Sequence, residues 1–363
     1  MKHTFVVFLL VLTFSLKSQI SPLDNKNGFV ISKQLPVTAV KQQYKTNTCW
    51  DFTTIAFLES ELLRIGKGEY NLSEMWIVRN AYIEKAERFL RLHGHMSFTG
   101  GGTLSDPLEI IKKYGLMPDS IYSGLVNGNI NHNHFEMDEL LKSYMESMVK
   151  SNNTDVNPSW RDGYIGILDA YMGKPPVDFV FRGKKYFPQS FAQTLNIDFN
   201  DYILITSFEY KPYYQKVLVE VPDNWMASQA YNIKLDDICS LIDYSIENGY
   251  TLCWAGDITE KGYKWADGVA YTEKADKKNI TAAIRQEAFD NYSTLDDHAM
   301  QVIGIAKDKD EEKMYLMKNS WGANDNSLNG FMMVSEDYVK YKTITLLVNK
   351  KGLPEGLKKN LGM

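Results

Sequence analysis

Apolar positions recur with helical spacing in the first third of the chain. In residues 50–64 they fall on one helical face, at Phe52, Ile55, Ala56, Leu62 and Leu63. The polar run 46–48 offers N-cap residues before this segment, and Gly66 is a stop signal after it. The same signals predict helices over 74–92, after the capping residue Ser73, over 107–114, ended by Gly115, and over 235–248.

Short apolar runs after residue 200 predict strands. We expect them at 202–206, 217–221, 250–255, 299–306, 314–317 and 330–334, with a charged hairpin loop over 307–313. Helices followed by strands indicate an α+β fold, in which a helical lobe packs against a β-rich lobe. A cleft between two such lobes is a natural place for a ligand.

The first residues have the layout of a secretory signal peptide. Lys2 and His3 form a basic start, and the apolar run 5–16 follows, with Ser18 as the small residue before a cut. The run is well short of the roughly 18 apolar residues that a membrane span needs. We therefore expect export after cleavage near Ser18 and no stable membrane anchor, with an uncleaved anchor as the alternative.

Composition and charge exclude several classes of function. The 363 residues are 44% hydrophobic and carry a net charge of −5, which supports a large core and argues against nucleic-acid binding. The glycine-rich segment 98–106 lacks the lysine of a phosphate loop. Two H-x-H pairs, at 93/95 and 132/134, have no acidic or cysteine cluster beside them, so we expect no metal and no cofactor.

The cysteine count is odd, with Cys49, Cys239 and Cys253. At least one thiol of an exported protein with three cysteines stays unpaired. Cys239 lies in a helix-like segment and Cys253 in a strand-like one. The two could pair or could both be core residues, and we favour the core, because this chain is not a small disulfide-rich scaffold.

Cys49 is the candidate nucleophile because it stands at the start of the first predicted helix. The partial positive charge of a helix N-terminus stabilises a thiolate, which is the reactive form of cysteine. Gln43, six residues upstream, carries an amide that can donate to an oxyanion. The alternative is an inert buried thiol, which is the commoner role of a free cysteine.

Motifs near the C-terminus change that balance. Asp297-His298-Ala299 and Lys318-Asn319-Ser320-Trp321-Gly322, set beside Gln43 and Cys49-Trp50, resemble the papain superfamily of cysteine peptidases, with the same order of residues. Glu59 falls where the central helix of that family carries a glutamate. From the residues alone, Glu59 is either an exposed polar position or a buried, hydrogen-bonded carboxylate.

The segments 173–181, 201–221 and 233–257 resemble more closely the bleomycin hydrolase and aminopeptidase C branch. The resemblance implies a papain-like two-lobe fold for residues 19–363, after a signal peptide at 1–18. We expect a helical lobe at about 43–124, an inserted region at about 125–245, a β-barrel-like lobe at about 246–345, and a short tail at 346–363.

The resemblance also implies a role for each site residue. Cys49 is expected to be the nucleophile, His298 the base and acid, and Asn319 the group that orients the imidazole. Gln43 and the Cys49 N–H are expected to form the oxyanion hole, with Trp50 and Trp321 as supporting residues. Gly101 and Gly102 are expected to offer backbone groups to an extended peptide substrate.

Two departures from the branch affect the expected activity. Members of the branch are typically intracellular, whereas this chain starts with an apparent export signal. The branch also has a C-terminal arm that restricts cleavage to the amino end of a peptide, and the tail here looks shorter. An open cleft would allow endopeptidase activity beside aminopeptidase activity. The branch forms hexamers, so a homo-oligomer is also implied.

The leading interpretation is a thiol-dependent peptidase acting on peptides. One alternative is a catalytically silent homologue that holds peptides in the same cleft. Another is a thiol acyltransferase, which uses the same groups with an amine in place of water. The complete set of Gln43, Cys49, His298 and Asn319 argues against a pure binder, because binding alone does not require all four.

Overall fold

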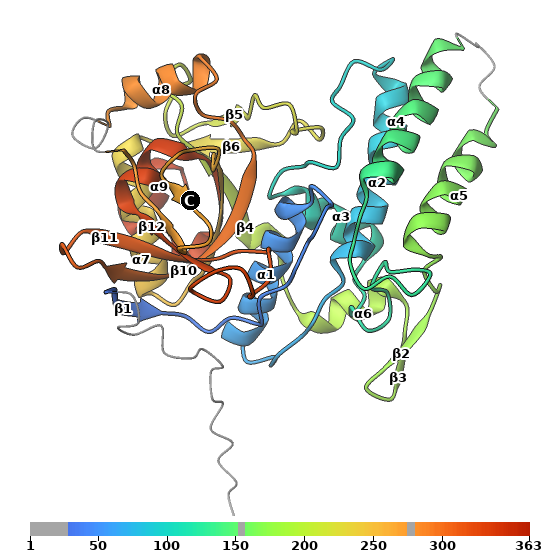
Figure 1. The fold of residues 1–363 in the computed structure, drawn as a ribbon, viewed down its shortest axis with the longest axis horizontal. Coiled ribbons are helices and arrows are strands. Elements are labelled where there is room, and N and C mark those ends of the chain that lie inside the picture. The colour runs from blue at the N-terminus through green and yellow to red at the C-terminus, as the bar shows by residue number, and fades with distance from the viewer. Residues whose placement is uncertain (1–27, 152–156, 274–279) are drawn as a thin grey trace, which may run out of the picture.

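Helix α1 (Cys49–Arg64) runs through the middle of the molecule, between a mainly helical side and a mainly β side (Figure 1). The computed structural model describes residues 28–151, 157–273 and 280–363. The predicted signal peptide lies outside the described residues. Every residue of α1 from Trp50 to Leu62 is buried, because the helix packs against α2 and α3 on one side and against strands β7 and β10 on the other.

The end of α1 follows the predicted stop. The N–H of Gly66 donates to the carbonyl of Leu63 (3.1 Å), and that of Lys67 donates to the carbonyl of Leu62 (2.9 Å). These two bonds form a Schellman motif, which needs a residue in the left-handed region at the first position after the cap. Gly66 has a φ of 77° and meets this need without strain.

The helical side holds the larger hydrophobic core. Its elements are α2 (Glu74–Arg91), α3 (Asp106–Tyr114), α4 (Phe135–Lys150), α5 (Trp160–Met172), α6 (Pro188–Leu195) and the hairpin of β2 (Phe179–Phe181) and β3 (Lys184–Tyr186). Ser73 caps α2 as predicted, because its hydroxyl accepts a hydrogen bond from the N–H of Trp76 (3.0 Å).

The β side is built on one mixed sheet. Within the described residues its strands are β1 (Val30–Gln34), β4 (Tyr202–Thr206), β5 (Lys216–Leu218), β6 (Gln229–Asn232), β7 (Leu252–Gly256), β8 (Tyr263–Lys264), β9 (Val269–Ala270), β10 (His298–Lys307), β11 (Lys313–Lys318), β12 (Phe331–Ser335) and β13 (Thr343–Asn349). They follow the order β5-β6-β4-β13-β7-β10-β11-β12-β9-β8, and β1 also pairs with β10.

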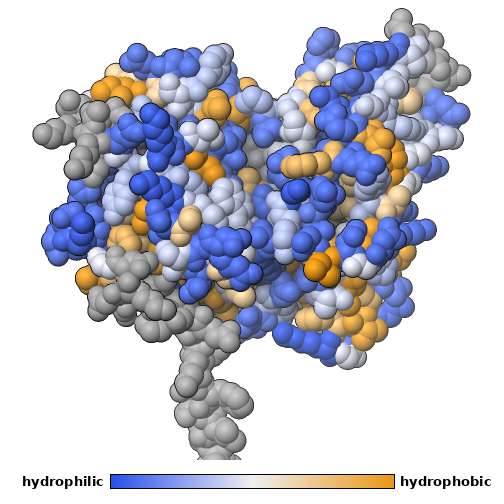
Figure 2. All heavy atoms as spheres, viewed as in Figure 1, coloured by the Kyte–Doolittle hydropathy of each residue, from blue (hydrophilic) through white to orange (hydrophobic). Residues whose placement is uncertain are grey.

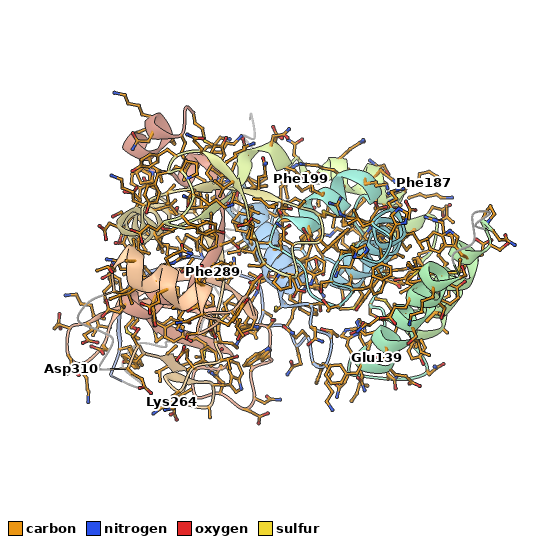
Figure 3. The ribbon with its side chains drawn as sticks, turned by 90° about the horizontal axis from the view of Figure 1, so that it is seen from above. Glu139, Phe187, Phe199, Lys264, Phe289 and Asp310 are labelled. Carbon is orange, nitrogen blue, oxygen red and sulfur yellow. The ribbon has the colours of Figure 1, made fainter. Side chains whose placement is uncertain are left out.

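Further helices complete this side of the molecule. They are α7 (Leu235–Glu247), α8 (Ala282–Asp290), α9 (Glu336–Lys342) and α10 (Glu355–Asn360), with the 3₁₀ turns η1 (Phe199–Asp201) and η2 (Lys350–Gly352). Side chains of α7, α9 and α10 join those of the sheet in a second hydrophobic cluster. Viewed from above, Lys264 and Asp310 mark the β side, Glu139 and Phe187 mark the helical side, and Phe199 lies between them (Figure 3).

The α+β fold class is confirmed, with one difference in its β part. The first and last strands of the path, β5 and β8, do not pair with each other among the described residues, so the sheet is open and does not form a closed barrel. Helices α4, α5 and α6 of the expected insert, with the β2–β3 hairpin, lie on the helical side, whereas β4, β5, β6 and α7 belong to the β side. The expected tail also begins inside β13, which lies between β4 and β7.

The two cysteines outside the candidate site lie in the interior of the protein. Cys239 and Cys253 are free and buried in different hydrophobic clusters, which confirms that both are core residues.

The face in Figure 2 is mostly hydrophilic and is hollowed at its upper edge, between the two sides. No helix within the three described ranges is both long enough and apolar enough to span a bilayer.

Gly66 and Gly166 form a matched pair for testing the helix end. Both are exposed, and an added Cβ would meet no atom within 4 Å at either position, but only Gly66 has a positive φ. Gly66→Ala should lower the free energy of unfolding by about 1 kcal/mol. Gly166→Ala, in the interior of α5, should raise it by up to about 1 kcal/mol. Urea denaturation measures both, and two changes of the same sign would contradict this account.

Candidate active site

Cys49 is the first residue of α1 and lines a cavity of about 480 Å³ between the two sides. The loop before it is held by a hydrogen bond between the hydroxyls of Thr46 and Thr48 (2.6 Å). The carbonyl of Thr48 accepts the first helical bonds, from Asp51 and Phe52. As a first-turn residue, Cys49 has an N–H with no partner inside the helix. Both its sulfur and this donor are therefore available to a ligand in the cavity.

His298 enters the same cavity from the β side, at the first position of β10. Its Nε2 bonds to Oδ1 of Asn319 at 2.8 Å. Since an amide oxygen only accepts hydrogen bonds, Nε2 carries the proton and Nδ1 keeps its lone pair. Asn319 is held in turn, because its Nδ2 donates to the hydroxyl of Tyr263 (3.1 Å).

Aromatic rings cover the bond between His298 and Asn319. The ring of Trp321 lies 4.6 Å from that of His298, centroid to centroid, and 5.2 Å from that of Trp265. His298 and Asn319 are only 4% and 2% exposed. Exclusion of water strengthens the hydrogen bond, because a lower local dielectric increases its electrostatic part.

Gln43 lies opposite this pair, on a segment joined to the residues after Asn319. Its N–H donates to the carbonyl of Ser320 (2.8 Å), and its side-chain oxygen accepts from the hydroxyl of Ser320 (2.7 Å). Gln43 is only 6% exposed, yet its Nε2 has no partner among the described residues and the side chain lines the cavity. The arrangement leaves the amide N–H₂ as a donor for a bound oxygen.

Trp50 and Lys85 fix the glycine-rich loop that forms another wall. The indole N–H of Trp50 donates to the carbonyl of Gly100 (3.0 Å). The ammonium of Lys85, a buried residue of α2, donates to the carbonyls of Thr99 (2.8 Å) and Gly101. Burial lowers the pKa of Lys85 to about 8, against the nearby negative charge of Asp223.

The two candidate glycines differ in what they offer to a substrate. Gly101 uses both backbone groups internally, since its N–H donates to Thr99 Oγ1 and its carbonyl accepts from Lys85. Gly102 has backbone groups without partners among the described residues. A Cβ on Gly102 would lie 2.9 Å from the Trp50 ring, so only glycine fits there. Of the pair, Gly102 is the one with groups free for a peptide backbone.

Burial disfavours a charged Cys49 thiolate and a charged His298 imidazolium when either forms alone. Burial raises the pKa of the Cys49 thiol to about 12, and the charge of Asp296 adds to the shift, while the Ala299 N–H opposes it. Burial lowers the pKa of His298 to about 4, against the hydrogen bond that its Nε2–H donates to Asn319. A proton moved from the thiol to Nδ1 creates both charges together, and their attraction offsets part of the cost of desolvation.

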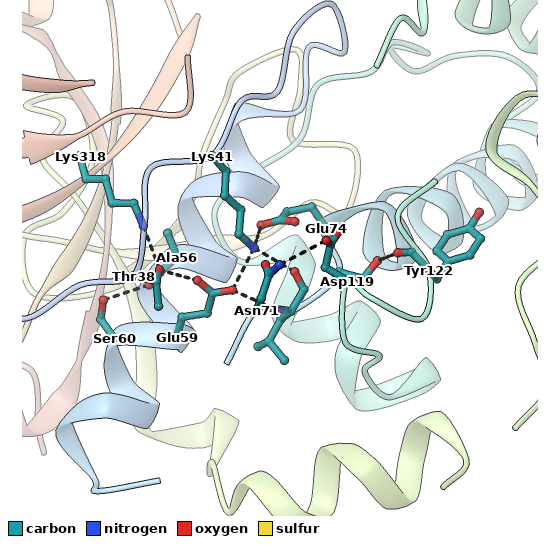
Figure 4. A network of polar contacts seen from close by, with 12 residues as sticks. Thr38, Lys41, Ala56, Glu59, Ser60, Asn71, Glu74, Asp119, Tyr122 and Lys318 are labelled. Carbon is teal, nitrogen blue, oxygen red and sulfur yellow. Dashed lines mark hydrogen bonds and ion pairs between the residues drawn. The ribbon is translucent and has the colours of Figure 1, made fainter. Parts of the chain in front are cut away.

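Beneath the site lies a buried network centred on Glu59 (Figure 4). Its carboxylate is 0% exposed and accepts hydrogen bonds from Thr38 (2.5 Å), from the ammonium of Lys41 (2.9 Å) and from the N–H of Leu72 (2.9 Å). The sequence allowed two interpretations of Glu59, an exposed polar residue or a buried, hydrogen-bonded carboxylate. The structure shows the buried, hydrogen-bonded carboxylate.

The Glu59 network reaches both halves of the site. Lys318, whose pKa is lowered to about 8 by burial, donates to Thr38 (3.0 Å) and immediately precedes Asn319. Lys41, which also pairs with Glu74 (2.5 Å), lies two residues before Gln43. The network therefore holds the segments that carry Gln43 and Asn319.

Several residues of the site had no assigned role in the sequence. Lys318 stands in the motif that revealed Asn319, and Asp296 stands next to Asp297-His298, so both were close to a recognised signal. Lys41, Tyr263 and Asp223 lie in segments with no such signal, because their roles depend on which distant segments fold beside them. His132 and His134 lie beside each other, and no third metal-binding side chain joins them in the described parts of the chain.

A cysteine at a helix N-terminus facing a histidine from a sheet defines the class of thiol peptidases with the papain fold. A family model described as the Peptidase C1-like family matches residues 14–363, and the chain belongs to that family. The resemblance to the aminopeptidase C branch is thereby confirmed, and the chain is a cysteine peptidase.

The similar proteins are distant in sequence and cover most of the chain. Aminopeptidase C of Listeria monocytogenes is 23% identical, over 90% of this chain and 84% of its own length. Aminopeptidase G of Lactobacillus delbrueckii is 22% identical, over 89% and 84%. The crystal structure of PepW from Lactobacillus rhamnosis has a TM-score of 0.73 at 19% identity, covers 92% of this chain and 84% of its own, and shows the same fold.

Glu59→Gln tests the buried network, because it keeps the shape of the side chain and removes its charge. The change leaves Lys41 and Lys318 with less compensation in a buried setting, so we expect a loss of about 3–5 kcal/mol in the free energy of unfolding. Glu109→Gln is the control, since it removes a carboxylate from an exposed pair with Lys112 and should cost no more than about 1 kcal/mol. Similar losses in urea denaturation would contradict the network's role.

Proposed function

We propose that the protein hydrolyses peptides as an aminopeptidase, through a mechanism that uses Cys49, His298 and Asn319. The hydrogen bond between His298 Nε2 and Asn319 is the observation that carries this proposal, because it leaves Nδ1 as the base in the cavity that Cys49 lines. The names of the relatives support the aminopeptidase part.

The first half-reaction forms a thioester. His298 Nδ1 takes the proton of the Cys49 thiol, and the thiolate attacks the carbonyl carbon of the substrate. The carbonyl oxygen becomes an oxyanion, which receives hydrogen bonds from Gln43 Nε2 and the Cys49 N–H. Each such donor contributes roughly 10²–10³ in rate. The imidazolium then gives its proton to the leaving nitrogen as the C–N bond breaks.

The second half-reaction releases the acyl group. His298, now neutral, takes a proton from a water molecule, whose oxygen attacks the thioester carbonyl. The oxyanion forms in the same place and collapses, the C–S bond breaks, and the proton returns to the sulfur. Asn319 keeps the ring oriented through both steps, because its oxygen accepts the Nε2–H in the neutral and the protonated state.

Endopeptidase cleavage is the second candidate, and the position of the C-terminal segment favours it. Leu353, Leu357 and Leu361 pack into the second hydrophobic cluster. None of residues 346–363 lines the cavity of Cys49 and His298, which we call the catalytic cavity. A cavity that this segment does not fill is open to a longer peptide.

Selective alkylation tests the nucleophile. At about pH 6 an ordinary thiol with a pKa of about 8.5 is protonated and reacts slowly with iodoacetamide. We expect Cys49 to be modified first, as measured by peptide mapping, and His298→Ala to abolish this preference because the base is gone. Cys239 and Cys253 are internal controls, since both are buried. Equal rates at all three would favour the catalytically silent homologue.

Hydrolysis of a free tetrapeptide and its N-acetylated counterpart tests the site of cleavage. An aminopeptidase removes residues one or two at a time from the free peptide and leaves the acetylated one intact, as mass spectrometry would show. Cleavage of both peptides at internal bonds would support the endopeptidase. Transfer of the acyl group to an added amine, in place of free acid, would instead identify an acyltransferase.

A further inference from the structure

The loop 219–228, which joins β5 to β6, extends from the β side towards the helical side (Figure 1). Trp225 is 5% exposed and belongs to the hydrophobic core of the helical side. Asn224 braces the loop, since its Nδ2 donates to the carbonyls of Val219 (2.7 Å) and Ser228 (2.9 Å) and its Oδ1 accepts from the Ser228 N–H (2.7 Å). The loop is thus an anchored bridge between the two sides.

This bridge meets the glycine-rich loop of the active site. Thr99 Oγ1 donates to Asp223 Oδ1 (2.9 Å), and the hydroxyls of Ser105 and Ser228 share a hydrogen bond (3.1 Å). A Cβ on Gly101 would lie 1.9 Å from Asp223 Oδ2, so the absence of a side chain there lets the carboxylate reach the wall of the cavity. Gly101 therefore serves the contact with Asp223.

The bridge also separates two cavities. Asp223 lines the catalytic cavity, whereas Trp225 and Ser228 line a larger one of about 850 Å³ behind it. The larger cavity contains none of Cys49, His298 and Asn319. The loop therefore contributes Asp223 to the wall of the catalytic cavity beside Gly101.

The catalytic cavity is acidic at this end. Asp223, Asp296 and Asp297 line it, and no lysine or arginine does so in the described parts of the chain. The Asp297 carboxylate is already used, since it accepts from the Ile258 N–H and from Thr259. Asp296 has no hydrogen bond or ion pair within the described ranges. The ammonium of Lys85 lies behind the wall, where it holds two carbonyls.

Gln43 indicates where the reacting carbonyl of a substrate would lie, independently of these carboxylates. Gln43 is only 6% exposed and lines the cavity, and its Nε2 has no partner among the described residues. A peptide with its carbonyl at this donor, extended along the free backbone groups of Gly102, would run towards Asp223, which lines the same cavity. An extended residue spans roughly 3.5 Å, so only a short stretch of chain fits before the bridge.

We propose that the carboxylates of Asp223 and Asp296 bind the protonated α-amino group of the substrate, and that the 219–228 bridge prevents the peptide from extending further. The proposal rests on the proposed function and assigns its preference for the amino end to residues of this chain. It decides between the two activities considered above, in favour of the aminopeptidase.

Electrostatics supports this assignment. Burial raises the pKa of Asp296 to about 8, and the charge of Asp223 adds to the shift. The charges of both residues also raise the pKa of the Cys49 thiol. A bound ammonium offsets these negative charges, so it favours ionisation of Asp296 and of Cys49 together.

The experiment compares substrates of equal size with and without the ammonium. Alanyl-aminomethylcoumarin is matched by propanoyl-aminomethylcoumarin, and alanyl-alanyl-aminomethylcoumarin by its propanoyl-alanyl counterpart, in case the amine lies one residue further. Asp223→Asn and Asp296→Asn each remove one charge and retain an oxygen acceptor. Glu220→Gln is the matched control, because it removes a carboxylate from the same loop outside the cavity, where it pairs with Lys211 (3.0 Å).

For the better amine substrate we expect Asp223→Asn to lower kcat/KM on the order of 10- to 100-fold, the effect of losing a hydrogen bond to a charged group. The loss should come mainly from a higher KM, and the propanoyl substrate should be much less affected. Asp296→Asn should act in the same direction, and Glu220→Gln should change neither substrate. Thermal unfolding checks that each variant is folded.

The possible results separate the two proposals. No cleavage of any substrate by the unmodified enzyme, with no labelling of Cys49, would overturn the proposed function itself. Cleavage of amine and propanoyl substrates at equal rates, or equal losses on both in the two variants, would overturn only the amine site. A preference for N-acetyl-lysyl over N-acetyl-alanyl coumarin that depends on Asp223 would assign the cation to a side chain and also overturn it.

Discussion

The relative positions of Cys49, Gln43 and Asn319 depend on a buried charge network, because these residues come from segments far apart in the chain. Glu59, on α1, accepts hydrogen bonds from Thr38 and Lys41, and Thr38 in turn accepts one from Lys318 at the end of β11. A buried carboxylate is tolerated only with such compensation. The same contacts that satisfy its charge therefore hold the strand before Asn319 and the segment before Gln43 against the helix that begins with Cys49.

The cleft above this network combines two opposing electrostatic requirements. Cys49, the proposed nucleophile, reacts as a thiolate, which the start of α1 and the Ala299 N–H favour and burial disfavours. Asp223 and Asp296 add negative charge that opposes it. If these carboxylates bind the amino group of a peptide, the substrate offsets their part of the opposition to the thiolate, while the effect of burial remains.

Residues with a local signature could be placed from the sequence. The helix after Cys49, its end at Gly66 and the Ser73 cap follow from spacing and capping chemistry, which act over a few residues. Helix α4 was missed although Met137, Leu141 and Met145 recur at helical spacing and are fully buried. Strand β13 was not predicted either, because the pairing partners of a strand are set by distant segments.

The sequence by itself determined the α+β order of elements and the resemblance to cysteine peptidases, and it supplied the candidate groups: a cysteine at a helix start, with a histidine and an asparagine in recognisable motifs. Only the tertiary structure decided that Glu59 is buried, that Gly101 makes room for Asp223, and that Asp223 of the 219–228 loop lines the cavity of Cys49. The physical reason is the separation along the chain over which each effect acts. Capping, periodicity and motif spacing are local, whereas burial, electrostatic fields and cavity shape arise from side chains brought together across hundreds of residues.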